Sequence, residues 1–171
     1  MTIVQACSFG GAWRRNVAPR RVLCVDDYQP GLRTLTKVLE HSGFDVVGTA
    51  DPDAISEITS QNDFDAVVLD FQLPDTNGVL LAQQLKQQNP NIPIVLITAY
   101  PADVPEHAAN WIDAFLCKGH RTARELPSVI VALISGKKKM SREETVATLR
   151  EAATEALQMD TDFAARLRSD S

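Results

Sequence analysis

The sequence predicts an α/β fold, a parallel sheet with helices on both of its faces. Three observations predict it. From Arg20 to Gly136, short apolar runs alternate with segments of helical spacing, which is the order of βαβ units. The apolar runs are nearly continuous, as in strands that are buried on both faces. Four of these runs lead into polar side chains, namely Asp26 with Asp27, Asp70, Thr98 and Lys118.

The first half of the pattern predicts two strands and two helices. Strands are expected at about 21–25 and 44–49, and a helix at about 29–42 in which apolar residues recur at helical spacing. Gly43 ends that helix, since glycine readily adopts the backbone that closes a helix. Asp51 and Pro52 resemble an N-cap followed by proline at the first helical position, which predicts a second helix to about residue 61.

The second half predicts three strands, at about 65–70, 94–98 and 114–117. Helices are expected at about 78–88 and at about 122–135, where Gly136 ends the second of them. Residues 102–111 should form only a short, weak helix, because Pro101 and Pro105 both interrupt it.

The two ends of the chain differ from this pattern. Residues 1–19 show no helical or strand period and are expected to form a flexible leader before a domain at 20–136. Residues 137–171 are expected to form a basic linker and a C-terminal helical extension. A capping box from Ser141 to Glu144 starts that helix, which should run to about residue 159 and be broken or re-capped by Asp160-Thr161-Asp162. Its narrow apolar stripe predicts packing on the domain or on a second copy of the chain, and comprises Val146, Leu149, Ala153, Ala156 and Leu157.

Composition excludes several classes of protein. The net charge of -5 and the pI of about 5.1 argue against a general grip on nucleic acid. No apolar run reaches the roughly 18 residues of a membrane span, and the first residues lack the pattern of a secretory signal. Cys24 and Cys117 fall in predicted strands and are expected to be small buried apolar residues. We therefore expect a cytoplasmic protein that binds neither membrane nor nucleic acid.

The polar strand ends predict a shared site. If the strand order is 2-1-3-4-5, the first and third strands are neighbours about 5 Å apart, at the edge where such sheets bind ligands. Asp26, Asp27 and Asp70 would then crowd together, and carboxylates that close need a counter-charge. Mg²⁺ suits such a set of oxygens. Thr98 offers a hydroxyl and Lys118 a positive charge, which a phosphoryl group on Asp70 would require.

These residues also carry a family resemblance. Four segments resemble the receiver domain of bacterial two-component response regulators over residues 20 to about 136, namely Val22–Asp27, Val67–Gly78, Leu96–Ala99 and Phe115–Lys118. The resemblance implies a flavodoxin-like fold with a five-stranded parallel sheet in the order 2-1-3-4-5, here followed by the C-terminal helix. It also implies that Asp70 accepts a phosphoryl group from a sensor histidine kinase or a phosphotransfer protein.

The resemblance implies further roles at the same strand ends. Asp27, Asp70 and the backbone carbonyl of Gln72 would ligate Mg²⁺, with Asp26 acting through water. Thr98 and Lys118 would contact the acyl phosphate. Phe115 matches the switch aromatic of the family, whose ring turns inward as the threonine shifts toward the phosphate. Output would pass through protein contacts, on the face of the fourth helix, fifth strand and fifth helix or on the extension, with a homodimer as one form.

Some features depart from the family pattern or leave alternatives open. Gly119 and His120 stand where the family has proline after the lysine, and we expect Gly119 to reach a similar turn through a positive φ. A phosphatase of the haloacid dehalogenase type also uses an aspartate and Mg²⁺, but it needs a second aspartate where this chain has Gln72. A receiver-like interaction module that is never phosphorylated stays open. Asp27 and Asp70 could also serve only as caps of helix and turn.

Overall fold

The computed structural model describes residues 19–119, 122–136 and 141–169, and the side chains of the last helix as far as Gln158. The predicted flexible leader up to residue 18, His120 and the predicted basic linker at Lys137–Lys139 lie outside the described residues.

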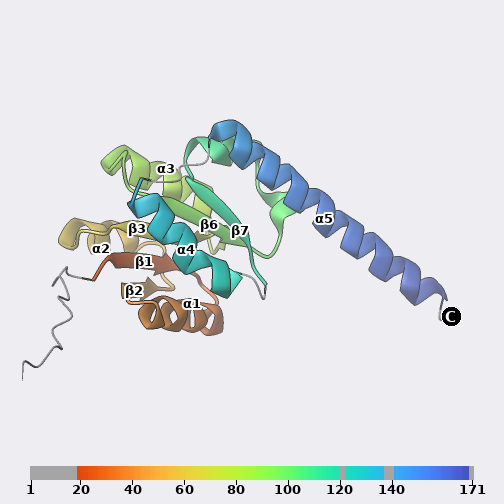
Figure 1. The fold of residues 1–171 in the computed structure, drawn as a ribbon, viewed down its shortest axis with the longest axis horizontal. Coiled ribbons are helices and arrows are strands. Elements are labelled where there is room, and N and C mark those ends of the chain that lie inside the picture. Colours follow the sequence, from red (N-terminus) through yellow and green to blue (C-terminus); the bar gives the residue numbers. More distant parts are fainter. Residues whose placement is uncertain (1–18, 120–121, 137–140, 170–171) are drawn as a thin grey trace, which may run out of the picture.

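A five-stranded parallel sheet forms the centre of the domain (Figure 1). Its strands lie in the order β2-β1-β3-β6-β7. Two short strands, β4 (Gln72–Leu73) and β5 (Thr76–Asn77), form a separate hairpin that was not predicted. The fourth and fifth predicted strands are therefore β6 and β7, and the predicted order 2-1-3-4-5 is confirmed. The five sheet strands are β1 (Arg21–Val25), β2 (Asp45–Thr49), β3 (Ala66–Asp70), β6 (Ile94–Thr98) and β7 (Ala114–Cys117).

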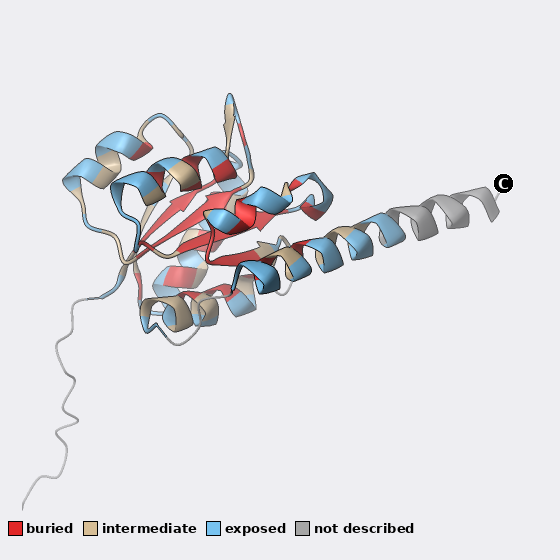
Figure 2. Cartoon of the chain, turned by 90° about the horizontal axis from the view of Figure 1, so that it is seen from above, coloured by how far each residue is buried: buried red, intermediate tan, exposed pale blue. Residues whose placement is uncertain are grey.

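Helices cover both faces of the sheet, and the buried strands lie between them (Figure 2). On one face, α1 (Gln29–His41) and α4 (Thr122–Ile134) bury leucine and isoleucine side chains against β1, β3 and β6. On the other face, α2 (Ile55–Gln61) and α3 (Gly78–Gln88) cover the second core cluster. α1 ends where Gly43 takes a φ of 90°, as predicted.

The start of α2 differs from the prediction. The helix begins at Ile55 rather than after Asp51 and Pro52, and no side chain caps it. The Asp51 carboxylate instead accepts a hydrogen bond from the Asp53 backbone N–H at 3.0 Å. An aspartate closes such a local turn as readily as it caps a helix. The predicted N-cap is therefore wrong, and Ile55 is the buried residue of the helix.

The weak helix predicted at 102–111 is replaced by two 3-10 segments, η1 (Pro101–Asp103) and η2 (Glu106–Asn110). Pro105 stands between them and has no N–H with which to continue a helical ladder. The face of the sheet that α2 and α3 cover therefore lacks a third α-helix within residues 20–119.

The C-terminal helix α5 (Arg142–Ser169) lies against η1, η2 and β7. Its predicted capping box is confirmed. The Ser141 N–H donates to Glu144 Oε2 at 2.7 Å, and the Glu144 N–H donates to Ser141 Oγ at 3.1 Å. Thr145 and Leu149 are buried in this contact, and Ala152 packs against the same core. The extension therefore packs on the domain, which was one of its two predicted uses.

The remainder of α5 differs from the prediction. The helix runs without a break through Asp160 to Ser169, because aspartate inside a helix costs only a few tenths of a kcal/mol. Figure 1 shows this second half extending away from the sheet. The predicted apolar stripe is confirmed except at its end: Leu149 is buried and Val146, Ala153 and Ala156 are half-buried, but Leu157 is 59% exposed.

The predictions for Cys117 and Gly119 need correction, whereas that for Cys24 is confirmed. Cys24 is buried, and burial raises the pKa of its thiol to about 12. Cys117, in contrast, is exposed, because it is the last residue of the edge strand β7. Gly119 is not among the residues with positive φ, so the predicted turn geometry after Lys118 is wrong. None of the helices in the described part of the chain has the length and apolar character that crossing a membrane requires.

Candidate functional site

The carboxyl ends of four strands meet at one rim of the sheet. The strand register pairs Val25 with Leu69, and Asp70 with Ile97. Asp26 and Asp27 directly follow β1, Asp70 ends β3, Thr98 ends β6 and Lys118 follows β7. Because the strands are parallel and in register, these side chains are all delivered to the same rim.

Three carboxylates are gathered there. One oxygen from each of Asp26, Asp27 and Asp70 lies within 4.8 Å of the others. Asp26 is fully buried and Asp70 is 5% exposed, whereas Asp27 is exposed to solvent. Three oxygen donors this close, one of them open to water, form the kind of site in which Mg²⁺ is held by carboxylates and keeps several waters.

Lys118 supplies part of the counter-charge. Its Nζ donates to Asp70 Oδ2 at 2.6 Å and to Asp26 Oδ2 at 2.9 Å. Its backbone N–H donates to the Thr98 carbonyl at 2.6 Å, which fixes the start of the side chain beside β6. From the sequence, we expected a divalent cation to neutralise these carboxylates. In the structure, Lys118 brings one positive charge to a cluster of three carboxylates.

The electrostatics of the pair follow from burial and contact. Burial raises the pKa of the Asp70 carboxyl, and the Asp26 charge adds to this effect, although Lys118 and the Gln72 N–H oppose it. Burial lowers the pKa of the Lys118 ammonium, but hydrogen bonds to Asp70 and Asp26 outweigh it and hold that pKa above its usual value. The lysine therefore keeps its charge at neutral pH.

Thr98, Phe115 and Gln72 surround this pair. Thr98 is fully buried, and its Oγ1 accepts a hydrogen bond from the Tyr100 N–H at 3.0 Å. Phe115 pairs with Leu96 in the sheet and is 5% exposed, so its ring is directed into the core. Gln72 lies in β4, and its N–H donates weakly to Asp70 Oδ1 at 3.4 Å.

Two residues that sequence reasoning left without a role fix the loop after Asp70. The Asn77 side chain caps α3 by accepting from the Val79 and Leu80 N–H groups, each at 3.0 Å. A Cβ on Gly78 would lie 2.3 Å from the Asp70 carbonyl oxygen, so only glycine fits. The signal was present in the sequence, since asparagine is a preferred N-cap at the start of an apolar helix.

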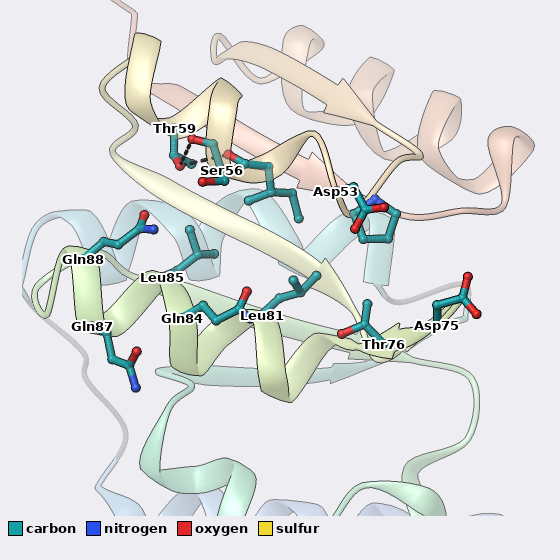
Figure 3. A pocket seen from close by; sticks show the side chains of 12 residues that line it. Asp53, Ser56, Thr59, Asp75, Thr76, Leu81, Gln84, Leu85, Gln87 and Gln88 are labelled. Carbon is teal, nitrogen blue, oxygen red and sulfur yellow. Dashed lines mark hydrogen bonds between the residues drawn. The ribbon is translucent and has the colours of Figure 1, made fainter.

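Solvent reaches the carboxylates through a hollow of about 800 Å³. Asp27, Asp70 and Lys118 line it, and the exposed rings of Tyr28 and Tyr100 flank it. A second hollow, of about 590 Å³, lies between α2 and α3 (Figure 3). Glutamine side chains of α3 and the apolar Leu81 and Leu85 line that one. The second hollow contains none of the predicted site residues, so we place the chemistry in the first.

Comparisons with known proteins agree with this geometry. The family model of the response regulator receiver domain matches residues 22–124. The alkaline phosphatase synthesis transcriptional regulatory protein PhoP of Bacillus subtilis is 34% identical over 80 residues, which are 47% of this chain and 33% of that protein. The matched part of the chain thus spans about a third of the length of such curated relatives.

Solved structures share the fold. A response regulator receiver domain from Clostridium thermocellum has a TM-score of 0.63 at 22% identity, over 69% of this chain and 96% of that one. The response regulator TrrA of Thermotoga maritima was solved in complex with Mg²⁺-BeF, with a TM-score of 0.60 at 22% identity over 67% and 98%. TrrA was also solved in complex with the histidine kinase ThkA, with a TM-score of 0.61 at 22% identity over 67% and 97%. With its sheet order, its rim and the match over most of residues 20–136, this chain belongs to the family of response regulator receiver domains.

Proposed function

We propose that Asp70 accepts a phosphoryl group from a sensor histidine kinase or a phosphotransfer protein, in a reaction that depends on Mg²⁺. The observation that carries this proposal is the placement of one ammonium, Lys118, against two buried carboxylates beside a third that is exposed. The chain would act as a phosphoacceptor with at most self-dephosphorylation, not as an enzyme with a substrate of its own.

The transfer step needs a nucleophile and positive charge at the same point. A carboxylate oxygen of Asp70 attacks the phosphorus of a phosphohistidine and forms an O–P bond. The P–N bond breaks, and the imidazole nitrogen keeps the electron pair. Lys118 stays protonated at neutral pH and would bind the phosphoryl oxygens as negative charge develops on them. The Thr98 hydroxyl at the end of β6 would hydrogen-bond the product.

The residues at the rim fit Mg²⁺. Asp26, Asp27 and Asp70 offer oxygen ligands within reach of one another, and the backbone carbonyl of Gln72 is proposed as a further ligand, with Asp26 acting through water. A bound Mg²⁺ offsets the charge of the carboxylates and of the incoming phosphoryl group. Of the three carboxylates, Asp27 is the one exposed to solvent and would hold the ion from the open side of the rim.

Partners and domain limits are part of the same proposal. TrrA binds a histidine kinase, and we extend that class of partner to this chain. The receiver would comprise residues 20–136, and residues 137–171 would form an extension that passes the signal to an output protein or to a second copy. The shift of Thr98 and the burial of Phe115 would form the switch between Asp70 and that surface.

The test is phosphorylation by a small donor. Incubation with acetyl phosphate and Mg²⁺ should add one phosphoryl group, seen by intact mass spectrometry, as acetate leaves with the breaking P–O bond. Asp70→Asn and removal of Mg²⁺ with EDTA should each abolish the added mass. A wild-type protein that stays unmodified with acetyl phosphate and with a phosphorylated kinase would favour the receiver-like interaction module instead.

A further inference from the structure

The first half of α5 takes the place of the helix that is missing from one face of the sheet. α2 and α3 cover only part of that face, and η1 and η2 are too short to cover the rest. Leu149 is 3% exposed and joins the same core cluster as Val104 of the η1 end and Phe115 of β7. The docked segment of α5, residues 142–157, is therefore part of the receiver core.

Hydrogen bonds link η1, on which the docked segment lies, to the carboxylate rim. The Tyr100 N–H donates to the Thr98 hydroxyl at 3.0 Å. The Tyr100 carbonyl in turn accepts from the Asp103 N–H at 3.2 Å, within the η1 turn. Only two residues, Ala99 and Tyr100, thus separate the end of β6, at the carboxylate rim, from η1, on which α5 lies. A displacement of Thr98 would therefore act on η1 through this short turn.

A phosphoryl group on Asp70 would cause such a displacement. It brings close to two negative charges and three strong acceptor oxygens. Lys118 and the Thr98 hydroxyl are the donors at this rim, and Thr98 is fully buried in the close-packed end of β6. Turning its hydroxyl toward the phosphoryl oxygens would disturb the hydrogen bond that Thr98 Oγ1 accepts from the Tyr100 N–H, and with it the turn that leads into η1.

The docked segment responds to a shift of η1 because its contacts are close-packed. Leu149 and Val104 are 3% and 7% exposed, and such contacts lose attraction when one side moves by a fraction of an ångström. An ion pair adds orientation, as Arg150 Nε donates to Glu106 Oε1 of η2 at 2.6 Å. Both side chains of the pair are exposed, so it contributes little energy but fixes the register.

We infer that docking of residues 142–157 on η1, η2 and β7 is coupled to the phosphoryl group at Asp70, so that phosphorylation weakens the docking. This coupling rests on the function proposed above, and release of the docked segment would be the output of that function. The docked segment is the occupant of this surface before phosphorylation, and release bares η1, η2 and β7. Coupling is reciprocal. Any change that loosens the docked segment must therefore strengthen binding of a phosphoryl mimic.

A charge-swap cycle tests the reciprocity. Arg150→Glu and Glu106→Arg each place like charges together and should loosen the docked segment without touching the core. Calorimetric titration of the full chain with beryllofluoride and Mg²⁺ should show tighter binding for each single variant, by roughly twofold, because an exposed ion pair contributes little energy to docking. The double variant restores an opposite-charge pair and should return to the wild-type affinity. Equal affinity of all four proteins, or weaker binding by the single variants, overturns the inference.

Hydrogen exchange gives an independent readout. Adding beryllofluoride and Mg²⁺ should speed exchange of amides in residues 145–157 and leave those of α1 unchanged. Unchanged exchange in residues 145–157 overturns the inference. Failure of the proposed function is distinguishable, because the wild type would then bind no beryllofluoride, or Asp70→Asn would bind it equally well.

Discussion

Each rim of the sheet holds a half-buried lysine paired with a buried aspartate, and the two rims differ in the number of carboxylates near the lysine. At the amino rim, Lys86 Nζ donates to Asp113 Oδ2 and to the Ile92 carbonyl, both at 2.6 Å. The Asp113 carboxylate also accepts from the Ile94 N–H at 2.9 Å. Among the described residues, one ammonium is hydrogen-bonded to one carboxylate there. At the carboxyl rim, one ammonium is hydrogen-bonded to two carboxylates, and a third carboxylate lies beside them.

The number of carboxylates near each lysine distinguishes the Lys86 pair, which joins parts of the fold, from the Lys118 cluster, where we propose the function. The Lys86–Asp113 pair also bonds the backbone at Ile92 and Ile94, so it ties α3 to the starts of β6 and β7. An excess of negative charge is costly in the unmodified protein and is relieved by a cation. The excess at the carboxyl rim is therefore the feature that a phosphoryl acceptor with a metal requires.

The largest expected effect comes from removing each lysine. Lys118→Ala leaves Asp26 buried without its ammonium, and Lys86→Ala does the same to Asp113. Each should lower the free energy of unfolding by about 3 kcal/mol, a usual cost of breaking a buried pair, in urea denaturation without divalent ions. Mg²⁺ should restore much of the loss in Lys118→Ala and none in Lys86→Ala. Equal recovery in both would remove the distinction between the rims.

A smaller effect is expected from Mg²⁺ on the unaltered protein. At ten times its Kd, the ion should stabilise the fold by about 1.4 kcal/mol, because it binds only the folded rim. Asp27→Asn should remove most of this gain and should not lower stability without Mg²⁺, because Asp27 is exposed and the substitution removes one of three crowded negative charges. Thermal unfolding with and without Mg²⁺ measures both. A full Mg²⁺ gain in Asp27→Asn would exclude Asp27 as a ligand.

The smallest effect concerns the exposed pair that orients α5. Arg150 lowers the pKa of the Glu106 carboxyl below its usual 4.5, and Arg142 adds to this. A lowered carboxyl pKa stabilises the docked state at pH values above 4.5, and this stabilisation is lost as pH falls through the lowered pKa. Hydrogen exchange of residues 145–157 should therefore rise in acid more in the wild type than in Glu106→Gln. Glu143 lines the same hollow and is present in both proteins, so the comparison isolates the Glu106 carboxyl.

Local sequence patterns were sufficient to predict which residues lie at the carboxyl rim. The four strands that lead to it, β1, β3, β6 and β7, each contain a short apolar run whose end is visible in the sequence. The parallel topology then brings these ends to one edge of the sheet. Asp70 and Thr98 close their strands in the structure as predicted. The separation between these residues in sequence did not matter, since strand order alone brings them together.

The α5 side could not be predicted in the same way. Whether Leu149 or Leu157 is buried depends on which helix face meets η1 and η2, and that contact joins segments about 40 residues apart. Helical periodicity alone allows several neighbouring stripes. The prediction of the start of α2 failed for a different reason. The Asp51 carboxylate can accept a backbone N–H two residues later either in a local turn or as a helix cap, and here it closes a turn. The prediction for Cys117 failed because it ends the edge strand β7, which has a neighbouring strand on only one side.

Locating the added phosphoryl group tests the central claim most directly. Protein treated with acetyl phosphate and Mg²⁺ is reduced with borohydride, which converts an aspartyl phosphate to homoserine, and is then sequenced by tandem mass spectrometry. We predict conversion at Asp70 alone. Conversion at Asp26, Asp27 or Asp113, with Asp70 intact in protein that had gained a phosphoryl group, would contradict the account.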